Sequence, residues 1–453
     1  MGSNPIKGFL SKKIDFYRRI LYYYTQFTIM PLKIVESFDA LNAKFAKNGY
    51  SLMAHQANAV RWMARREDKT IKGGILADEM GVGKTIETIG LIVQRPVLYT
   101  LIIVPASLIN QWKQELGKFV SGLNISIHNF NGKTKPINIV ITSFVKSSRT
   151  HIQEFRWDRI IIDEAHIIRN PKGKIYKSIC KLKSDKKWCL TGTPIQNYLS
   201  DIKSLFKFIG VVNTQDTKKT IKKYLFRRTK EEVNIKLGGY EHHDHIIEFE
   251  SLYEKQLYQK VQDNIYESVD LSHLEIILRM RQASILPQLV IDGYSKKKKL
   301  KEIKWKYKNT KLSSIVKTLV DNPDEKPVVF CYFRKEIEFL EEKLEEKSIT
   351  YNVIQGSVDM DERQEIIASS DDFRVLIVQI MAGSTGLNLQ KFNSVYFTGP
   401  HWNPTHEQQA IARVYRMGQK KKVKVRRFIL KNTIEEWILR IQGNKIDMIN
   451  DML

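Results

Sequence analysis

The stretch GGILADEMGVGKT, residues 73–85, has the form of an apolar strand, a glycine turn and the start of a helix. Such a turn aims backbone N–H groups and a helix N-terminus at bound phosphates. The strict phosphate-loop pattern GxxxxGK[ST] requires glycine at position 78, where this chain has Asp78. We expect the phosphate cradle to persist, because Gly81 and Gly83 remain where the backbone passes closest to phosphate.

Two side chains at the end of this stretch and two further along the chain would complete an ATP site. Lys84 is expected to contact the β and γ phosphates, and the hydroxyl of Thr85 to hold Mg²⁺. The motif DEAH at 163–166 follows the apolar run RIII. At the end of a strand, Asp163 can bind Mg²⁺ and Glu164 can orient or deprotonate the attacking water. The two motifs in this order favour an ATP-hydrolysing site over two solvated turns.

Short apolar runs recur along the chain, each followed by a turn and a helical pattern. The first series consists of GGILA at 73, LIIVP at 101, NIVITS at 138, RIIIDEAH at 159 and WCLTGTP at 188. The second begins with PVVFCYF at 327 and continues through YNVIQG, RVLIVQI, SVYFTG and VKVRRFIL. This alternation is typical of parallel sheets flanked by helices, so the sequence predicts an α/β protein with two lobes.

The boundaries between these series suggest five segments. They are a basic, aromatic helical extension over 1–50, a first lobe over 51–211, a helical insertion and hinge region over 212–310, a second lobe over 311–440 and a tail over 441–453. Within the extension, one helical face is expected to carry Ile14, Tyr17, Leu21 and Tyr24 and to pack on the first lobe.

The charge balance points to a polyanionic partner. The chain has 74 Lys and Arg against 49 Asp and Glu, for a net charge of +25, which favours nucleic acid over a membrane surface. Nine lysines lie in 296–311, interrupted by a few apolar residues. This run is consistent with a phosphate-tracking strip, with an import signal or with a solvated loop.

Cysteine and histidine usage argues against structural zinc. The three cysteines have no CxxC spacing, which indicates a reducing, intracellular setting without a disulfide framework. EHHDH at 241–245 has the composition of a metal site, but no second ligand cluster accompanies it, so we expect an exposed segment. The most apolar stretch, 97–109, is thirteen residues long and is interrupted by polar residues and a proline, so we expect no membrane span.

The segment THEQQAIARVYRMGQ near the end of the second series carries clustered arginines. Thr405 stands three residues before Gln408, which we interpret as a capping box. The helix that follows would present Gln409, Arg413 and Arg416 on one face. Alone, this pattern favours a basic surface helix. Together with the first-lobe motifs it makes the arginines candidate fingers, which typically contribute about 10³ to 10⁵ in rate.

The ordered set of motifs over roughly residues 50–440 resembles the Swi/Snf family of ATPases in helicase superfamily two. The motifs are LMAHQANAVRWM, ADEMGVGKT, IIVPASLINQW, ITSF, DEAHIIRN, LTGTPIQN, FRRTKEEV, AGSTGLNL, HWNP and QQAIARVYRMGQ. Members of that family usually lack the leading glycine of the phosphate loop, so Asp78 supports the resemblance. The resemblance implies two tandem RecA-like lobes and a compact member of the family that is nearly all motor. A viral source is left open.

The resemblance implies ATP and Mg²⁺ as cofactors and a role for each motif residue. The nucleotide-binding residues would be Gln56, which would read the adenine edge, Asp78, Gly81, Gly83, Lys84, Thr85, Asp163 and Gly386. The metal ligands would be Thr85, Asp163 and Glu164. Hydrolysis would be coupled to lobe closure by His166, Thr191, Gly192, Thr193 and Gln409. The catalytic set would be Lys84, Asp163, Glu164, Arg413 and Arg416.

The resemblance also implies double-stranded DNA as partner, with nucleosomes or the transcription machinery left open. The DNA contacts would come from Pro105, Ser107, Thr142, Ser143, Gly383, Asn388 and Trp402. Blander interpretations are that Trp402 is a core residue and that Ser107 or Thr142 caps a turn. The chain departs from the family pattern at Leu286, before Pro287, and at Ser384, after Gly383.

We therefore expect a DNA translocase that couples ATP hydrolysis to movement on DNA or to remodelling of protein–DNA complexes. The location would be intracellular, in the nucleus or at a site of viral replication, with the cytoplasm left open. Two rivals stay open: a helicase that separates the strands of DNA or RNA, and an inactive DNA-binding scaffold. HWNP and YRMGQ argue against the first rival, and the intact catalytic set argues against the second.

Overall fold

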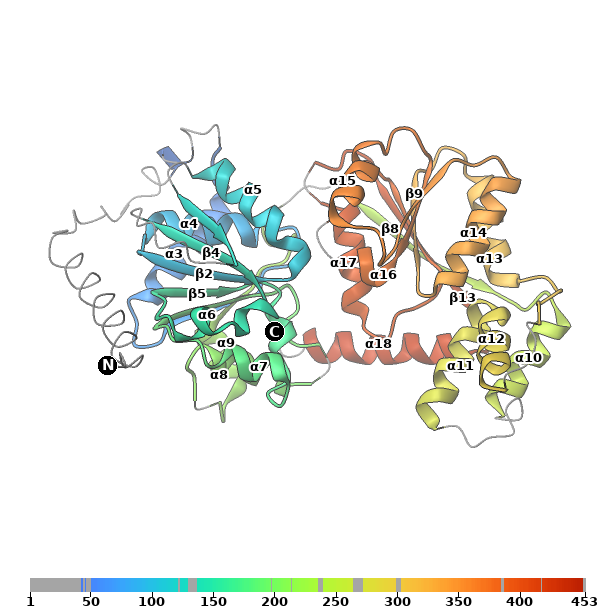
Figure 1. Ribbon diagram of the computed structural model, residues 1–453, viewed down its shortest axis with the longest axis horizontal. Helices are drawn as coiled ribbons and strands as arrows, with labels where there is room; N and C mark the ends of the chain where they lie inside the picture. Colours follow the sequence, from blue (N-terminus) through green and yellow to red (C-terminus); the bar gives the residue numbers. More distant parts are fainter. Residues whose placement is uncertain are drawn as a thin grey trace, which may run out of the picture.

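The computed structural model describes residues 42, 43, 45, 50–120, 123–128, 137–196, 198–212, 214–234, 239–263, 272–298, 303–383, 387–416 and 418–450. The helical face expected around Tyr17, together with Ser384 and Gly386, lies outside these residues. Figure 1 shows the described chain as two α/β lobes side by side, the first in blue and green and the second in orange and red. The predicted fold class is therefore confirmed.

Lobe 1 is built on a seven-stranded sheet in the order β3-β4-β2-β5-β6-β1-β7. Every pair of neighbouring strands is parallel. The strands are β1 Lys72–Leu76, β2 Tyr99–Val104, β3 Asn124–Ile127, β4 Asn138–Ser143, β5 Arg159–Ile162, β6 Lys186–Leu190 and β7 Leu225–Phe226. The central strands are almost fully buried apolar runs, as expected for a parallel sheet covered on both faces.

Helices cover both faces of this sheet and create two separate cores. They are α3 Ala54–Glu67, α4 Lys84–Gln94, α5 Ile109–Phe119, α6 Thr150–Glu154, α7 Lys174–Ile179, α8 Ser200–Phe208 and α9 Thr217–Tyr224, with the 3₁₀ turns η1 Ala106–Leu108, η2 Lys146–Ser148 and η3 Ala165–Ile168. A buried ion pair fastens α3 to the sheet, with Arg159 Nε 2.6 Å from Glu67 Oε1. Trp188 Nε1 also donates to this carboxylate, at 3.1 Å, so the buried charge is well satisfied.

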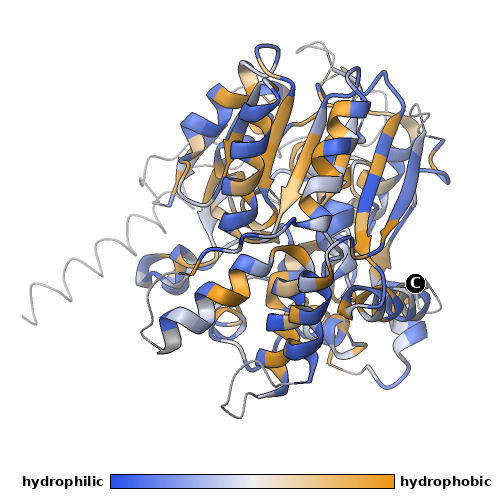
Figure 2. Cartoon of the chain, turned by 90° about the vertical axis from the view of Figure 1, so that its right-hand side faces the viewer, coloured by the Kyte–Doolittle hydropathy of each residue, from blue (hydrophilic) through white to orange (hydrophobic). Residues whose placement is uncertain are grey.

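Lobe 2 has a six-stranded sheet in the order β10-β11-β9-β12-β13-β8, again with only parallel pairs. Its strands are β8 Tyr240–Ile247, β9 Pro327–Cys331, β10 Tyr351–Ile354, β11 Val375–Gln379, β12 Ser394–Phe397 and β13 Val423–Leu430. Its helices are α13 Thr310–Asp321, α14 Arg334–Glu346, α15 Met360–Ala368, α16 Ile380–Gly383, α17 Pro404–Val414 and α18 Ile434–Asn450. Figure 2 shows apolar strands in the interior, helices around them with hydrophilic and hydrophobic residues, and largely hydrophilic strands at one edge.

The segment expected to be a helical insertion, 212–310, also contains two strands that we did not predict. Its helices α10 Leu252–Gln262, α11 His273–Ile285 and α12 Pro287–Lys298 form a small module with its own apolar cluster. Strand β7, however, extends the sheet of lobe 1, and β8 extends that of lobe 2. The chain thus crosses between the lobes after β7 and before β8.

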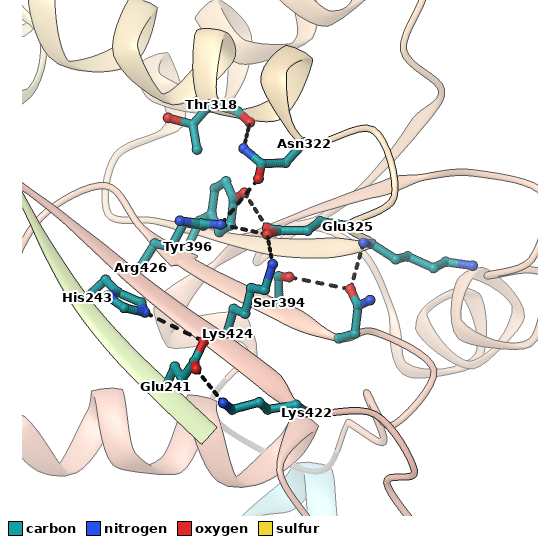
Figure 3. Close-up of polar contacts among 12 residues, drawn as sticks. Glu241, His243, Thr318, Asn322, Glu325, Ser394, Tyr396, Lys422, Lys424 and Arg426 are labelled. Atoms are coloured by element: carbon teal, nitrogen blue, oxygen red, sulfur yellow. Dashed lines mark hydrogen bonds and ion pairs between the residues drawn. The ribbon is translucent and has the colours of Figure 1, made fainter. Parts of the chain in front are cut away.

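The motif EHHDH at 241–245 lies within β8, at one edge of the lobe 2 sheet. Its side chains are half-buried or exposed. Asp244 forms an ion pair with Arg427 of β13, whose Nε lies 2.8 Å from Asp244 Oδ1. Among the described residues, no group of three or more His, Cys, Asp or Glu side chains is arranged to hold a metal ion. The histidines therefore belong to a strand of the sheet, where Figure 3 shows His243 beside Glu241.

A buried carboxylate ties the neighbouring strands of this sheet together (Figure 3). Glu325 accepts hydrogen bonds from the Tyr396 hydroxyl at 2.6 Å, Arg426 at 2.6 Å and Lys424 at 3.0 Å. Burial raises the pKa of Glu325, but the hydrogen bonds from Arg426, Tyr396 and Lys424 outweigh burial and lower that pKa to about 2. This carboxylate therefore joins β12 and β13 to the chain that enters β9.

Candidate nucleotide site between the two lobes

The candidate site begins where three adjacent strands of lobe 1 end. In the sheet order, β5, β6 and β1 are neighbours, and they lead into DEAH, TGT and the phosphate loop. The carboxyl ends of parallel strands lie at one edge, which is where α/β proteins bind nucleotides. The fold therefore brings together three motifs that lie far apart in the sequence.

The phosphate loop has the backbone that the two glycines predict. Gly81 and Gly83 have φ values of 91° and 120°, a region that L side chains rarely adopt. A Cβ atom on Gly83 would lie 2.6 Å from Gln56 Nε2. Gln56 is buried, and its side chain also accepts a hydrogen bond from the Met53 backbone N–H at 3.0 Å. The loop thus packs directly against α3, next to the residue expected to recognise adenine.

The first turn of α4 carries the two side chains expected to meet phosphate and metal. Lys84 Nζ donates to the carbonyl oxygen of Asp78 at 2.6 Å and to that of Glu79 at 3.4 Å. The ammonium group is therefore inside the loop that would surround the phosphates. Thr85 follows as the second residue of α4 and is half-buried. These positions are consistent with the roles expected for both residues.

The carboxylate of Asp78, a residue expected to bind the nucleotide, is engaged elsewhere. It is fully buried and forms an ion pair with Arg228, whose Nε lies 3.1 Å from Asp78 Oδ2. The same guanidinium reaches Glu87 Oε1 of α4 at 2.7 Å. Burial and the charge of Asp78 raise the pKa of Glu87, which Arg228 opposes. The side chain of Asp78 therefore supports the loop from behind rather than offering a free ligand.

Two residues of the FRRTKEEV motif, Arg228 and Lys230, complete this support, a role that we did not predict for them. The Arg228 carbonyl accepts from the Glu79 backbone N–H at 2.9 Å. Lys230 Nζ lies 3.5 Å from Glu79 Oε1, and its Cε atom would be 3.4 Å from a Cβ on Gly81. The sequence shows this motif as part of the family pattern, but it does not show that the charges of the motif are buried against the phosphate loop.

The acidic pair follows β5. Trp112 Nε1 donates to Asp163 Oδ2 at 2.8 Å, and Glu164 has a left-handed backbone with φ 50°. Burial and the charge of Glu164 raise the pKa of Asp163 to about 6. Burial also raises the pKa of Glu164, but the hydrogen bond and charge of His166, with the charges of Lys84 and Arg413, lower it to about 2. Glu164 is thus the more anionic member of the pair.

The residues expected to couple hydrolysis to movement lie beside this pair. His166 Nδ1 is 3.3 Å from Glu164 Oε2 and 3.4 Å from Thr191 Oγ1. Thr191 Oγ1 in turn accepts from the Thr193 backbone N–H at 3.1 Å. A Cβ on Gly192 would lie 3.5 Å from Lys84 Nζ. The DEAH and TGT motifs are therefore connected to each other and to the phosphate loop.

Lobe 2 presents its arginines toward this edge. Arg413 lies in the last turn of α17, where burial lowers its pKa and the negative charge of Glu164 raises it. Arg416 lies beyond the end of α17, so it does not share a helical face with Gln409 as predicted. Burial lowers the pKa of Arg416 as well, and Glu115 of lobe 1 opposes that shift. Both guanidinium groups thus interact with charges of lobe 1.

The start of α17 differs from the prediction. Its N-cap is Asn403, whose side chain accepts from the Thr405 backbone N–H at 3.1 Å, and Pro404 is the first helical residue. The capping role expected for Thr405 was therefore wrong, because the stronger cap two residues earlier starts the helix. Asn403 Nδ2 also lies 3.3 Å from Gln196 Oε1, which joins the two lobes.

The residues expected to contact DNA differ in whether their side chains already have partners within the protein. Thr142 is fully buried, with Oγ1 3.2 Å from His128 Nδ1, and Ser143 Oγ accepts from the Lys146 backbone N–H at 3.2 Å. Trp402 packs edge-on against Trp437, with ring centroids 5.8 Å apart. These three side chains have structural partners. The other described candidates are Pro105, which precedes η1, Ser107 within η1, Gly383 at the end of α16 and the exposed Asn388.

The residues present fit a magnesium–nucleotide complex. A hydroxyl from Thr85 and carboxylates from Asp163 and Glu164 are the oxygen donors that Mg²⁺ prefers. The glycine cradle has no room for a side chain at Gly83. Among the described residues, no helix is long and apolar enough to cross a membrane.

Two family models match the chain. The SNF2-related domain matches residues 55–219, and the helicase conserved C-terminal domain matches residues 307–418. These regions contain the phosphate loop and the arginines, respectively. The two matches therefore cover the two sides of the candidate site.

Several proteins are similar over most of the chain. A "Probable global transactivator" of Orgyia pseudotsugata multicapsid polyhedrosis virus is 28% identical over 88% of this chain and 91% of its own length. An "Uncharacterized ATP-dependent helicase" of Mycoplasma pneumoniae is 30% identical over 89% of this chain, which spans 42% of that protein. The "TATA-binding protein-associated factor MOT1" of Saccharomyces cerevisiae is 26% identical, and the chain spans 27% of it.

A solved structure, "Sulfolobus solfataricus SWI2/SNF2 ATPase core in complex with dsDNA", is 25% identical. The match covers 89% of this chain and 93% of that one, with a TM-score of 0.42.

Proposed function

The chain belongs to the SNF2-related family of ATP-dependent motors, with two tandem RecA-like lobes, and from this premise we propose that it is a translocase of double-stranded DNA. One observation carries the proposal: Asn403, at the start of the helix that bears Arg413, joins lobe 2 to lobe 1 with Nδ2 3.3 Å from Gln196 Oε1, and the charge of Glu164 in lobe 1 acts on Arg413. An ATP site shared by two lobes converts hydrolysis into relative movement of those lobes.

Each residue of the site has a distinct chemical task in this proposal. Lys84 supplies the cation for the β and γ phosphates, and Glu164, kept anionic, orients the attacking water. Arg413 and Arg416 stabilise the charge that develops on the transferred phosphoryl group. Bound Mg²⁺, held by Thr85 and Asp163, would neutralise phosphate charge.

The contacts between the lobes provide the element that hydrolysis would switch. Asn403 bonds to Gln196 across the lobes, and Lys230 Nζ lies 4.8 Å from the ring centroid of Tyr415. The charge of a shared triphosphate would shift the balance between open and closed arrangements of the lobes that these contacts join. Each cycle would then move one lobe along the duplex relative to the other.

The DNA-binding part of the proposal rests on charge. A net charge of +25 suits a phosphate backbone, and contacts to phosphate are tolerant of sequence and sensitive to salt. We propose that duplex movement serves remodelling of a protein–DNA complex, in transcription, chromatin or repair, in the nucleus or at a site of viral replication. The names of the relatives support transcription in particular.

ATPase assays with duplex and single-stranded DNA test this function. We expect duplex DNA to stimulate hydrolysis far more than single strands, and displacement of a triplex-forming oligonucleotide to require ATP. Lys84→Ala should abolish stimulated hydrolysis while DNA binding persists. Stimulation by single strands with unwinding of a duplex would identify a strand-separating helicase instead. Absent turnover in the wild-type protein at any DNA concentration would identify an inactive scaffold.

A further inference from the structure

The lysine-rich run that links the helical module to lobe 2 contains a segment with strict alternation. Residues 303–308 read IKWKYK, so that every second side chain is a lysine and the others are apolar or aromatic. We call these residues, together with Tyr253 of α10, the lysine–aromatic strip. Lys311, at the end of the run, is not part of it, because its ammonium group is fully buried in an ion pair with Glu435.

The strip is held in a defined path by one side chain of α12. Gln288 Oε1 accepts from the Trp305 backbone N–H at 2.6 Å, and Gln288 Nε2 donates to the Ile303 carbonyl at 2.8 Å. The same amide nitrogen donates to Asp292 Oδ1 at 2.7 Å, which orients the glutamine. A backbone bonded on both sides of residue 304 has few conformations to lose when it binds a ligand.

The aromatic rings of the strip form a stack at the surface. The rings of Tyr253 and Tyr307 lie 4.0 Å apart at 18°, and Trp305 meets Tyr307 edge-on with centroids 5.1 Å apart. Tyr253 remains 53% exposed and Tyr307 47% exposed, although each covers the other. A rigid stack of half-exposed aromatic rings is thus presented to solvent.

The lysines beside this stack offer charge. Lys304, Lys306 and Lys308 are exposed. Lys308 forms an ion pair with Glu250, whereas in the described part of the chain no carboxylate pairs with Lys304 or Lys306. Two exposed ammonium groups on the same short segment as Trp305 and Tyr307 thus have no acidic partner among those residues.

We propose that the lysine–aromatic strip is an accessory binding site for a single strand of nucleic acid, whether RNA or DNA. Proteins bind unpaired strands by combining backbone-tracking cations with aromatic faces on which bases stack. A duplex would use the lysines but not the rings, because its base faces are covered by neighbouring base pairs. The combination of both elements on one fixed segment therefore favours an unpaired strand.

The location separates this site from the ATP site. Figure 1 shows α10 and α12 at the end of lobe 2 that lies away from lobe 1, and Figure 2 is turned so that this end faces the viewer. A strand held here would not occupy the candidate nucleotide site between the lobes. The strip would instead tether a transcript or a displaced strand near the duplex on which the motor acts.

Fluorescence anisotropy with short labelled oligo(dT), oligo(U) and a duplex of similar charge tests the proposal on the full chain. We expect Tyr253→Ala to weaken binding of both single strands by about 10-fold and to leave the duplex affinity unchanged, because one stacking contact is lost. Tyr50→Ala is the matched control, since Tyr50 is a 40% exposed tyrosine that lies against Phe119 in lobe 1. Comparing oligo(dT) with oligo(U) distinguishes DNA from RNA.

A second pair of variants tests the charge. Lys304→Glu with Lys306→Glu should weaken single-strand binding. The slope of log affinity against log salt concentration should become shallower by about one to two. Lys317→Glu with Lys347→Glu makes the same change in net charge on exposed residues of lobe 2 and should have a smaller effect. Basal ATPase activity, expected to be unchanged throughout, reports that every variant is folded.

The results that would contradict the proposed strip differ from those that would contradict the proposed motor function. If Tyr253→Ala leaves single-strand affinity at the wild-type value, or weakens the duplex equally, the proposed site is wrong. Crosslinking of bromouridine-labelled oligonucleotides should also map to the strip, and crosslinks confined to the two lobes outside the strip would overturn the assignment. Failure of DNA-stimulated ATP hydrolysis would count against the proposed motor function alone.

Discussion

The guanidinium group of Arg228 binds the carboxylate of Asp78, with Nε 3.1 Å from Oδ2, at the loop position where the strict pattern has glycine. The departure from the pattern is therefore a structural device. A buried acid at this position anchors the phosphate loop to the chain that leaves β7, and through Glu87 the same arginine holds α4. A glycine would provide neither anchor.

Asp78→Gly, which restores the strict phosphate-loop pattern, is expected to destabilise the protein and lower its ATPase activity. Breaking a buried ion pair typically costs about 3–5 kcal/mol, and the lower end is expected because Glu87 still pairs with Arg228. Thermal unfolding should show a midpoint several degrees lower. The control is Asp68→Gly, since Asp68 forms an exposed pair with Arg95, which typically contributes about 1 kcal/mol or less. Equal midpoints for the two variants would contradict the anchoring role.

Trp112→Phe is expected to lower the affinity for Mg²⁺, so that hydrolysis requires a higher Mg²⁺ concentration. The variant removes the indole N–H that donates to Asp163 Oδ2 at 2.8 Å and helps lower the pKa of that carboxyl. Losing a partner of a metal ligand typically costs about 10–100-fold in metal affinity. The measurement is the Mg²⁺ concentration that gives half-maximal ATPase activity.

Trp157→Phe serves as its control. Trp157 is also buried in lobe 1, but its Nε1 donates to the Ile152 carbonyl at 3.0 Å, away from the acidic pair. Both substitutions remove the same atoms from a core. A similar shift in Mg²⁺ dependence for the two variants would show that general loosening of lobe 1, rather than the hydrogen bond to Asp163, is responsible.

Arg413→Ala should lower the DNA-stimulated turnover number by about 10³-fold or more while ATP binding persists. The guanidinium acts on charge that develops in the transition state, so the loss belongs in turnover rather than in nucleotide affinity. Arg413→Lys should recover only part of the rate, because an ammonium group lacks the planar fork. Arg440→Ala, at an exposed arginine of α18, is the control and should retain activity. Wild-type turnover in Arg413→Ala would rule out a finger.

Glu325→Gln is expected to destabilise lobe 2 at neutral pH and to have little effect in acid. The folded-state pKa of Glu325 is about 2, below the value of about 4.3 for an unperturbed glutamate. Its stabilising contribution is therefore present above the unfolded pKa and is lost as the pH falls through the folded pKa. Urea unfolding at several pH values should show the wild type and the variant converging between about pH 5 and pH 2. A constant difference across that range would contradict the ionised state shown by the contacts in Figure 3.

Much of the fold could be predicted from the local pattern of apolar residues. The ten apolar runs identified in the sequence are all strands of the two sheets, because strands buried on both faces need continuous apolar segments. The three unpredicted strands lack that signal. β3 is half-buried throughout, β7 has two residues, and β8 carries charges on an exposed edge. Their pairing depends on a neighbouring strand rather than on their own composition.

In the candidate site, too, some features could be predicted from the sequence and others depend on tertiary contacts. The glycines, Lys84 and the acidic pair were identifiable because phosphate and Mg²⁺ chemistry requires those residue types in a short motif. The anchoring of Asp78 was not identifiable, since Arg228 lies 150 positions away in the sequence. The donor to Asp163, the true cap of α17 and the end of that helix before Arg416 were missed for a related reason, since each depends on which neighbours are present in the folded chain.

Short-range chemistry along the chain thus specifies the strands, the phosphate cradle and the residue types able to hydrolyse ATP. Long-range packing specifies which charges are buried together, which aromatic rings stay exposed on the lysine–aromatic strip, and which arginine of lobe 2 interacts with the acidic pair of lobe 1. The physical reason is that a motif needs only neighbouring residues, whereas desolvation and charge pairing depend on everything that surrounds a group in three dimensions.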